Sequence, residues 1–167
     1  MMKIQLGGLS EGVHNYQFQV EASDLGLPEN FSRPVRVEIA LDKSGTQALL
    51  RGEVRTAGKF CCDRCTSMFE CAVLSKYQVC YIPESSDASQ IDPAELQVIS
   101  PGSGVIEIAE DVRQTILLGV PFKLLCSENC LGLCPRCGTN LNEGTCACEV
   151  SIDDPRWEML RPLRDNN

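Results

Sequence analysis

The chain has 167 residues, of which 43% are hydrophobic, and a formal net charge of −8. This length allows one domain with a core and a small appendage. The acidic balance is the opposite of the basic patch typical of nucleic-acid-binding proteins, and it favours a basic partner. No stretch approaches the roughly 18 apolar residues of a membrane helix, and the N-terminal residues contain no apolar run of signal-peptide length. We therefore expect a soluble, cytoplasmic protein.

Alternating apolar and polar residues predict antiparallel strands through the first half of the chain. Residues 1–22 alternate weakly, with Tyr16, Phe18 and Val20 on one face, and residues 35–41 alternate clearly. A turn at 42–45 and a returning strand at 48–55 complete a hairpin. Strand character resumes over 69–82, with Val73, Ser75, Tyr77 and Val79 on one face. Residues 1–82 are therefore predicted to form an antiparallel β domain, as an open sheet or a partly open barrel.

The second half of the chain begins with a polar stretch and continues with a helical pattern. Residues 83–104 contain four acidic residues and no Lys or Arg, which indicates a mobile loop or a sheet edge. Apolar residues then recur at helical spacing from Val105 to Val120, which predicts an amphipathic helix within 105–125 that packs on the sheet. After the last cysteines, Asp154 and Pro155 are suited to begin a short helix that carries Trp157.

The cysteines are the most informative residues of the chain. There are eleven, and six of them fall within residues 126–148. In a cytosolic protein, clustered cysteines are more often metal ligands than disulfides. An odd number would also leave one unpaired in a disulfide framework. Four close pairs have ligand-like spacing: Cys62 and Cys65, Cys126 and Cys130, Cys134 and Cys137, Cys146 and Cys148.

The pairs within 134–148 predict a zinc-ribbon-like module. A structural zinc ion takes four ligands tetrahedrally, and close cysteine pairs supply two ligands from one turn. In the run Cys134-Pro-Arg-Cys137, the turn allows backbone N–H groups to point at the first thiolate, and Gly138 permits the positive φ that follows. We expect Cys134, Cys137, Cys146 and Cys148 to hold one zinc ion.

The two remaining pairs leave two arrangements open. Cys62 and Cys65 with Cys126 and Cys130 would form a second site that joins the β domain to the segment after the helix. Alternatively, one zinc ion uses Cys126 or Cys130 together with the 134–137 pair and leaves the 62–65 pair free. One or two zinc ions per chain are therefore expected, with up to eight ligands within residues 126–167 and at the 62–65 pair.

The remaining candidate residues give no sign of catalysis. Cys61, Cys71 and Cys80 have no partner at ligand spacing, and Cys71 and Cys80 are expected in the core. His14 is the only histidine and lies in a polar context. Four thiolates make a closed structural site, whereas catalytic zinc keeps a position open. With no glycine-rich phosphate loop or nucleophile elbow, the chain is not expected to be an enzyme and no catalytic residue is assigned.

The tail of the chain resembles the YceD-like family of bacteria and plastids. The resemblance rests on the run LCSENCLGLCPRCGTNLN at 125–142, on the 146–148 pair, and on Asp154-Pro155-Arg156. The sequence Cys62-Asp-Arg-Cys65 is similar to the other cysteine pair of that family. The predicted amphipathic helix, which ends at Leu118-Gly-Val-Pro121, lies where the family also has a helix. The resemblance covers the last two-thirds of the chain. Thr66 departs from it, because an apolar residue is expected there.

The resemblance implies a role in accumulation or processing of 23S rRNA during assembly of the large ribosomal subunit. The expected partner is the large-subunit precursor, contacted through a basic ribosomal protein or through 23S rRNA itself. The charge of −8 favours the protein. A local basic face would be needed for RNA, and the candidates for it are Arg33, Arg36, Arg51, Arg55 and Lys59.

Two other functions are alternatives to this one. A redox-sensing zinc protein would release its metal on oxidation, which requires exposed, acidic thiols. A dithiol oxidoreductase would use Cys62 and Cys65, but that pair lacks the strand–motif–helix context of thioredoxin-like folds. The predicted fold is α+β: a mainly antiparallel sheet or partly open barrel, one amphipathic helix, and a C-terminal zinc-ribbon-like module.

Overall fold

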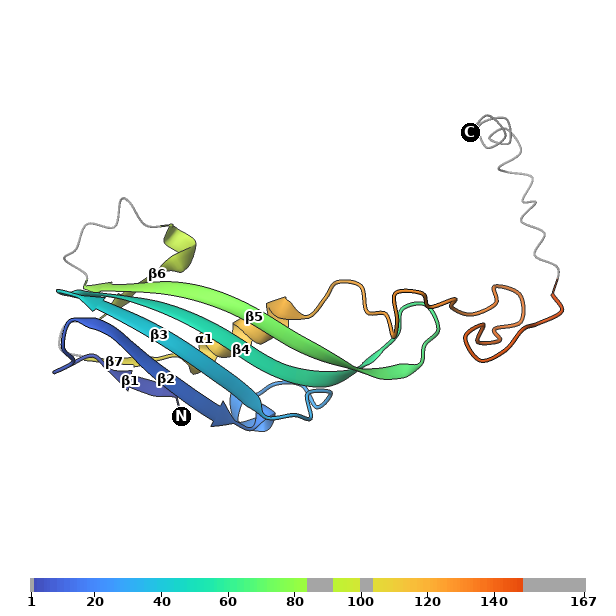
Figure 1. Ribbon diagram of the computed structural model, residues 1–167, viewed down its shortest axis with the longest axis horizontal. Helices are drawn as coiled ribbons and strands as arrows, with labels where there is room; N and C mark the ends of the chain where they lie inside the picture. The colour runs from blue at the N-terminus through green and yellow to red at the C-terminus, as the bar shows by residue number, and fades with distance from the viewer. Residues whose placement is uncertain (1, 84–91, 100–103, 149–167) are drawn as a thin grey trace, which may run out of the picture.

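A computed structural model describes residues 2–83, 92–99 and 104–148 of the chain. Strands dominate these described ranges, and the one α-helix found there comes late (Figure 1). In chain order the elements are β1 (Lys3–Gln5), β2 (Gly12–Val20), the 3₁₀ turn η1 (Ala22–Leu25), β3 (Val35–Ser44), β4 (Gln47–Cys61), β5 (Met68–Pro83), the 3₁₀ turn η2 (Pro93–Glu95), β6 (Leu96–Ile99), β7 (Val105–Glu107) and α1 (Ala109–Gly119).

The strands form one five-stranded sheet and one two-stranded sheet. The larger sheet has the order β2-β3-β4-β5-β6, and its pairs are antiparallel except for β6, which runs parallel to β5. β1 pairs with β7 in the smaller sheet. In the described part of the chain β2 and β6 form the two edges, so the sheet does not close into a barrel. The predicted α+β fold with a mainly antiparallel, open sheet is confirmed.

Alternation along the strands gives the large sheet one buried face. On β3 the residues Val35, Val37, Ile39 and Leu41 are buried, while their neighbours are exposed or half-buried. α1 covers this face and buries Val112 and Ile116 against it. Burial of each such side chain contributes roughly 1.5–3 kcal/mol. The apolar residues of the patterns predicted at 35–41 and 69–82 build the core, and Tyr16, Phe18 and Val20 are half-buried against it.

α1 ends in close contact with β5. A Cβ added to Gly119 would lie 1.8 Å from Oγ of Ser75, so only glycine allows this approach. Val120 follows with φ −66° and ψ 125°, an extended conformation that ends the helix. The chain then runs alongside the sheet toward the far tip of the β4–β5 hairpin (Figure 1). This geometry brings the cysteine-rich segment to the end of the longest strands.

Two predicted boundaries differ from the observed ones. The helix expected within 105–125 occupies only Ala109–Gly119, because Val105–Glu107 forms β7 and pairs with β1. Periodicity could not decide this, because β7 has only three residues and its pairing with Lys3–Gln5 is long-range. The polar stretch 83–104 contains β6, an edge strand, in its described part.

One predicted element lies outside the described part of the chain. The short helix predicted to begin at Asp154, with Trp157 in it, lies outside the described residues. Among the described helices, none has the length and apolar character needed to cross a membrane.

Candidate metal centres

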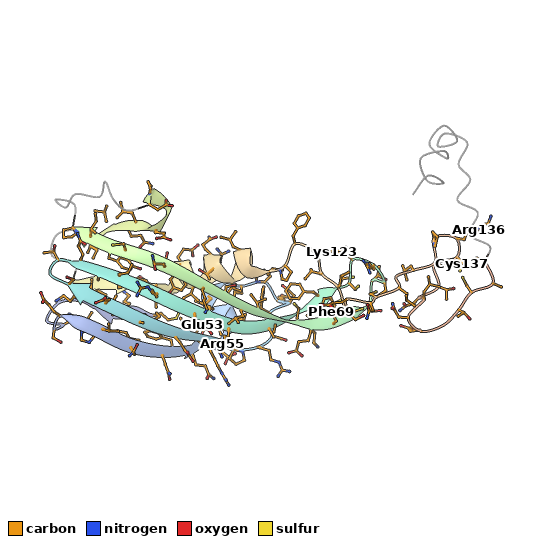
Figure 2. All side chains as sticks on the ribbon, turned by 45° about the horizontal axis from the view of Figure 1, so that its top comes forward. Glu53, Arg55, Phe69, Lys123, Arg136 and Cys137 are labelled. Carbon is orange, nitrogen blue, oxygen red and sulfur yellow. The ribbon has the colours of Figure 1, made fainter. Side chains whose placement is uncertain are left out.

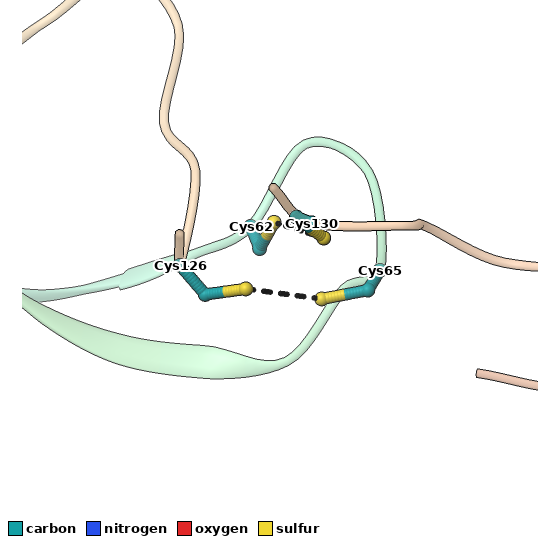
Figure 3. Close-up of side chains that lie close together, drawn as sticks. All are labelled: Cys62, Cys65, Cys126 and Cys130. Atoms are coloured by element: carbon teal, nitrogen blue, oxygen red, sulfur yellow. Dashed lines mark hydrogen bonds between the residues drawn. The ribbon is translucent and has the colours of Figure 1, made fainter. Parts of the chain in front are cut away.

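The tip of the β4–β5 hairpin is a tight turn built around two cysteines. The N–H of Cys62 donates to the carbonyl of Ser67 at 3.0 Å, and the N–H of Thr66 donates to the carbonyl of Cys62 at 2.9 Å. Thr66 has φ 60° and is the only residue other than glycine with positive φ in the described ranges. The turn places the Cys62 and Cys65 side chains on the same side of the hairpin tip (Figure 3).

The segment after α1 is fixed to this tip by reciprocal hydrogen bonds. The N–H of Asp63 donates to the carbonyl of Leu124 at 2.8 Å, and the N–H of Leu124 donates to Oδ2 of Asp63 at 2.7 Å. Further along, Nη1 of Arg64 donates to the carbonyl of Cys130 at 2.9 Å. The hairpin therefore holds both ends of the loop that carries Cys126 and Cys130.

Four thiols meet at this junction and form what we call the hairpin cluster: Cys62, Cys65, Cys126 and Cys130. Their Sγ atoms all lie within 4.8 Å of one another (Figure 3). The Sγ atoms of Cys62 and Cys130 are 3.8 Å apart, and those of Cys65 and Cys126 are 3.6 Å apart.

These separations can be compared with those of bonded sulfur. Tetrahedral ligands at a Zn–S distance of about 2.3 Å are about 3.8 Å from each other, whereas a disulfide holds its sulfurs at about 2.05 Å. All eleven cysteines lie in the described ranges and none is disulfide-bonded there. The hairpin cluster therefore fits a tetrahedral zinc ion, and it does not fit a pair of disulfides.

The surroundings of the hairpin cluster shift the pKa values of its thiols in opposite directions. Burial raises the pKa of the Cys62 thiol, but the backbone N–H groups of Cys126, Cys65 and Arg64 outweigh burial and lower that pKa to about 6. The pKa of Cys126 is raised to about 12, first by its hydrogen bond with Cys65 and then by burial. Crowded thiols resist joint ionisation, and a bound divalent cation removes that resistance.

A small apolar shell surrounds the hairpin cluster. Cys62, Cys65 and Cys130 are no more than 3% exposed, while Cys126 is exposed. The apolar residues packed against them come from β5 and from both sides of the 126–130 loop: Phe69, Leu125 and Leu133. The cluster is thus a second, smaller core at the end of the sheet.

The second turn, at residues 134–139, repeats the hydrogen bonds of the first. The N–H of Cys134 donates to the carbonyl of Thr139 at 2.8 Å, and the N–H of Gly138 donates to the carbonyl of Cys134 at 2.9 Å. Gly138 has φ 74°, as predicted for the residue after the second cysteine. Backbone N–H groups of Cys137 and Arg136 lower the pKa of the Cys134 thiol, which agrees with the expected turn geometry.

The second group of thiols, which we call the ribbon cluster, consists of Cys134, Cys137, Cys146 and Cys148. Their Sγ atoms also lie within 4.8 Å of one another. The hydroxyl of Thr139 is the main cause that lowers the pKa of Cys137 to about 6, and the hydrogen bond with Cys137 is the main cause that raises the pKa of Cys148 to about 12. As in the hairpin cluster, one thiol is acidic and another resists ionisation.

The donor atoms of the two clusters suit a structural metal ion. Each cluster offers four cysteine sulfurs, a soft set that suits zinc in structural sites. Cysteine provides every ligand in both clusters, so four bonds would leave no position for a substrate or water. Either cluster can therefore hold a metal ion that stabilises shape.

The structure groups the predicted ligands in one of the two ways that the sequence left open. Cys126 and Cys130 lie with the hairpin pair, and Cys134 and Cys137 lie with the 146–148 pair. The grouping of Cys126 or Cys130 with the 134–137 pair is not the observed one. That the eight cysteines bind metal remains a prediction.

The other cysteines lie outside both clusters. Cys61 is exposed, and its Sγ donates to the carbonyl of Thr66 at 3.2 Å. The expectation that Cys71 and Cys80 lie in the core is wrong, because both are only half-buried. Cys80 alternates with buried Val79 and Tyr81 and so points to the opposite face of β5.

The candidate basic face lies on the outer side of the hairpin. Arg36 of β3 is directly opposite Arg55 of β4, and Arg51 and Lys59 share that side of β4. Acids lie among them. Arg55 is paired with Glu53, and outside the strands Arg33 is 2.9 Å from Glu70. Figure 2 shows Glu53 and Arg55 side by side on the sheet. The face therefore carries both signs of charge.

Sequence reasoning did not single out the residues that join the parts of the site. Asp63 and Arg64 bind the 124–130 segment, and Asn140 and Asn142 reach from the ribbon to the hairpin. Asn140 and Asn142 lie inside the run that carries the family resemblance, and this was the only sign in the sequence that they have a role. Where their amide groups point could not be inferred from it.

Comparison with known proteins gives one family and several relatives. A family model described as "Large ribosomal RNA subunit accumulation protein YceD" matches residues 50–164. A chloroplastic protein of Arabidopsis thaliana named large ribosomal RNA subunit accumulation protein YCED homolog 1 is 24% identical over 157 residues, covering 79% of this chain and 49% of its own length. The chain thus spans about half of that relative.

Mycobacterial proteins are also similar to the chain. An uncharacterised protein of Mycobacterium tuberculosis is 36% identical over 64 residues, covering 36% of this chain and 30% of its own. One of Mycobacterium leprae is 25% identical over 109 residues, covering 65% of this chain and 49% of its own. No solved structure matches the chain.

Proposed function

The chain belongs to the YceD family of large ribosomal RNA subunit accumulation proteins, and on this basis we propose that it is a non-enzymatic, zinc-binding factor. In this proposal it supports accumulation and processing of 23S rRNA during assembly of the large ribosomal subunit in the cytoplasm. The observation that supports the zinc part is the spacing of the hairpin cluster, in which the Sγ separations of 3.8 and 3.6 Å match tetrahedral zinc.

Zinc would connect the segments of the chain that were predicted from the sequence. The proposed arrangement is a β domain at 1–82, an acidic linker at 83–104, a helical segment at 105–125 and a cysteine-rich module at 126–167. The hairpin cluster takes Cys62 and Cys65 from the first part and Cys126 and Cys130 from the last. One zinc ion there would fix the module to the β domain, and a second in the ribbon cluster would fold the module itself.

Charge favours a basic ribosomal protein as the partner over naked 23S rRNA. The chain carries a net charge of −8. Each zinc ion bound by four thiolates would add a site charge of about −2. The basic face is interrupted by Glu53 and Glu70, which are paired with Arg55 and Arg33. The net negative charge of the chain would repel an RNA backbone and attract a basic protein.

The function can be tested in a strain that lacks the gene. Complementation with the wild-type chain should restore the amount of mature 23S rRNA relative to 16S rRNA, and Cys62→Ser with Cys134→Ser should fail to do so. Affinity capture from nuclease-treated extract should still recover a basic large-subunit protein. Recovery that depends on intact RNA would exclude the protein-partner part of the proposal.

A redox-sensing zinc protein is the second candidate. It is favoured by the exposure of Cys126 in the hairpin cluster and of Cys137 in the ribbon cluster, because an oxidant can reach one ligand of each. Peroxide at physiological concentration should then release zinc from the purified chain and abolish partner capture. Full retention of zinc under those conditions excludes the switch.

A further inference from the structure

We infer that Asn142 couples the two clusters, so that a metal ion in the ribbon cluster strengthens metal binding at the hairpin cluster. The inference rests on the zinc binding proposed above and concerns how one site regulates the other. Asn142 belongs to the ribbon, in the loop between Cys137 and Cys146. Its side chain nevertheless lies against the loop that supplies Cys130.

The amide of Asn142 makes three contacts. Its Nδ2 donates to Sγ of Cys130 at 3.4 Å and to Oδ1 of Asn140 at 2.8 Å. Its Oδ1 accepts from the N–H of Leu131 at 2.8 Å. One side chain thus binds both the thiol of a predicted ligand and the backbone that follows it. The acceptor bond to Leu131 fixes the orientation of the amide and aims Nδ2 at the sulfur.

The loop that carries Asn142 is itself tied to the hairpin. Nδ2 of Asn140 donates to Oγ of Ser67 at 3.3 Å, and the N–H of Leu141 donates to the carbonyl of Gly132 at 2.9 Å. The N–H of Leu133 donates to the carbonyl of Arg64 at 3.1 Å. Residues 140–142 therefore rest on the same turn and loop that form the hairpin cluster.

A hydrogen bond to a thiolate ligand stabilises its charged form, which is the form that binds metal. Such outer contacts typically change metal affinity by about 10–100-fold. The position of Asn142 depends on the chain between Cys137 and Cys146, which a metal ion in the ribbon cluster would hold at both ends. Loss of that ion would leave the loop held only by its hydrogen bonds to the hairpin side, and the contact between Asn142 and Cys130 would weaken.

The coupling predicts an order of events. The ribbon cluster can form from residues 134–148 alone, whereas the hairpin cluster reaches full affinity only after the ribbon has closed. Metal should therefore leave the hairpin cluster more readily once the ribbon cluster has lost its own. Binding free energies are reciprocal, so a filled hairpin cluster should likewise retain metal in the ribbon cluster.

The test measures zinc release from the purified full chain to a coloured chelator, together with visible spectra of the Co²⁺-loaded chain. Cys148→Ser removes the ribbon site, so the phase that remains in this variant belongs to the hairpin cluster. That phase should be about 10–100-fold faster than the hairpin phase of the wild type. Asn142→Ala should accelerate the same phase. Combining the two changes should add little, because both act through one contact.

Asn142→Asp separates hydrogen bonding from packing. The aspartate keeps an oxygen for the N–H of Leu131 but turns a second oxygen, not a donor, toward Cys130. It should release hairpin zinc faster than Asn142→Ala and shift the thiolate absorption of bound Co²⁺. A purely structural role would leave Asn142→Asp like the wild type. Asn129→Ala is the matched control, since Asn129 is an exposed amide in the 126–130 loop and should release zinc at the wild-type rate.

The outcomes distinguish this inference from the function proposed above. A wild-type chain that binds no zinc overturns both. Two zinc ions per chain, with hairpin release unchanged in Asn142→Ala and Asn142→Asp, overturn the coupling alone. An unchanged hairpin phase in Cys148→Ser also overturns the coupling and leaves the zinc proposal standing.

Discussion

The hairpin cluster and the ribbon cluster use the same local turn for different purposes. Residues 62–67 and 134–139 share a Cys-x-Arg-Cys pattern, the same pair of backbone hydrogen bonds and a hydroxyl residue at the last position. They differ in where the other two cysteines come from. In the hairpin cluster the other two cysteines are distant in sequence, since Cys126 lies 61 residues after Cys65. In the ribbon cluster all four cysteines lie within residues 134–148.

This difference determines what each cluster can stabilise. A link between residues distant in sequence removes much of the freedom of the unfolded chain, and a link within a short loop removes less. Three of the four thiols of the hairpin cluster are buried and have their own apolar shell, whereas only Cys134 is buried in the ribbon cluster. The hairpin cluster should therefore support the fold of the whole chain, and the ribbon cluster should support only its own module.

The largest effect is expected from Cys62→Ser. It should reduce zinc from two ions to one per chain and lower the free energy of unfolding by on the order of 4 kcal/mol, which is the value of a cross-link that closes a loop of roughly 60 residues. Zinc content and thermal unfolding measure these quantities. Cys61→Ser is the matched control because its thiol is exposed and outside both clusters. Two zinc ions in Cys62→Ser would contradict the prediction.

Cys148→Ser should remove one zinc ion with a smaller effect on the sheet. With excess zinc to keep the hairpin cluster filled, we expect the free energy of unfolding of the sheet to change by less than about 1 kcal/mol, since the ribbon cluster closes only a short loop. Hydrogen exchange measures this locally. Amides of residues 133–148 should exchange faster, and those of β3, β4 and β5 should not. Faster exchange throughout the sheet would show that the two clusters are not as different as proposed.

Asp63→Ala tests the connection between the two long-range segments. Asp63 Oδ2 accepts from the N–H of Leu124 at 2.7 Å, and Pro135 at the matching position of the ribbon turn has no carboxylate to make such a bond. Loss of this exposed bond should lower the free energy of unfolding by about 1 kcal/mol. Pro135→Ala is the comparison and should not detach any segment. Equal effects of the two changes, measured by denaturant unfolding, would contradict the role given to Asp63.

The two regions also differ in how far the sequence predicts them. The hairpin at 35–55 follows from strict alternation, and the ribbon ligands follow from spacing within 15 consecutive residues, 134–148. Both depend on contacts that are close in the chain. The pairing of β1 with β7 joins Lys3–Gln5 to Val105–Glu107, and no local pattern specifies it. The grouping of the 126–130 pair with the 62–65 pair was one of two alternatives for the same reason.

Side-chain hydrogen bonds were beyond sequence reasoning altogether. Asp63 and Asn142 are polar residues in polar loops, and such residues are usually solvated. Their roles depend on the arrival of a distant segment at the hairpin tip. Arg55 illustrates the converse: its place on the outer face of the hairpin follows from alternation, but its ion pair with Glu53 reduces its value as a phosphate contact. The sequence thus predicted on which face of the sheet a side chain lies, but not which residue it pairs with.

The smallest effect on the stability of the sheet is expected at the fifth position of each turn, where the backbone has a positive φ. Thr66 adopts φ 60°, and Gly138 adopts φ 74°. A β-branched residue in this region is strained by roughly 1–2 kcal/mol, and glycine is not. Thr66→Gly relieves that strain but loses the bond from Oγ1 of Thr66 to the carbonyl of Cys65, at 2.7 Å, and increases the freedom of the unfolded chain. We expect a net gain in unfolding free energy below about 1 kcal/mol.

The reciprocal change, Gly138→Thr, should act in the opposite direction. A Cβ at position 138 would meet no heavy atom within 4 Å, so its cost is the backbone strain of about 1–2 kcal/mol without a steric clash. Because the ribbon cluster is local, this strain should appear as faster zinc release from the ribbon and not as a lower melting temperature of the sheet. Thr66→Gly should instead raise the melting temperature, since its turn belongs to the cluster that joins the distant segments. If both changes affected only their own metal ion, strain at the hairpin tip would not be transmitted to the sheet, and the hairpin cluster would be as local as the ribbon cluster.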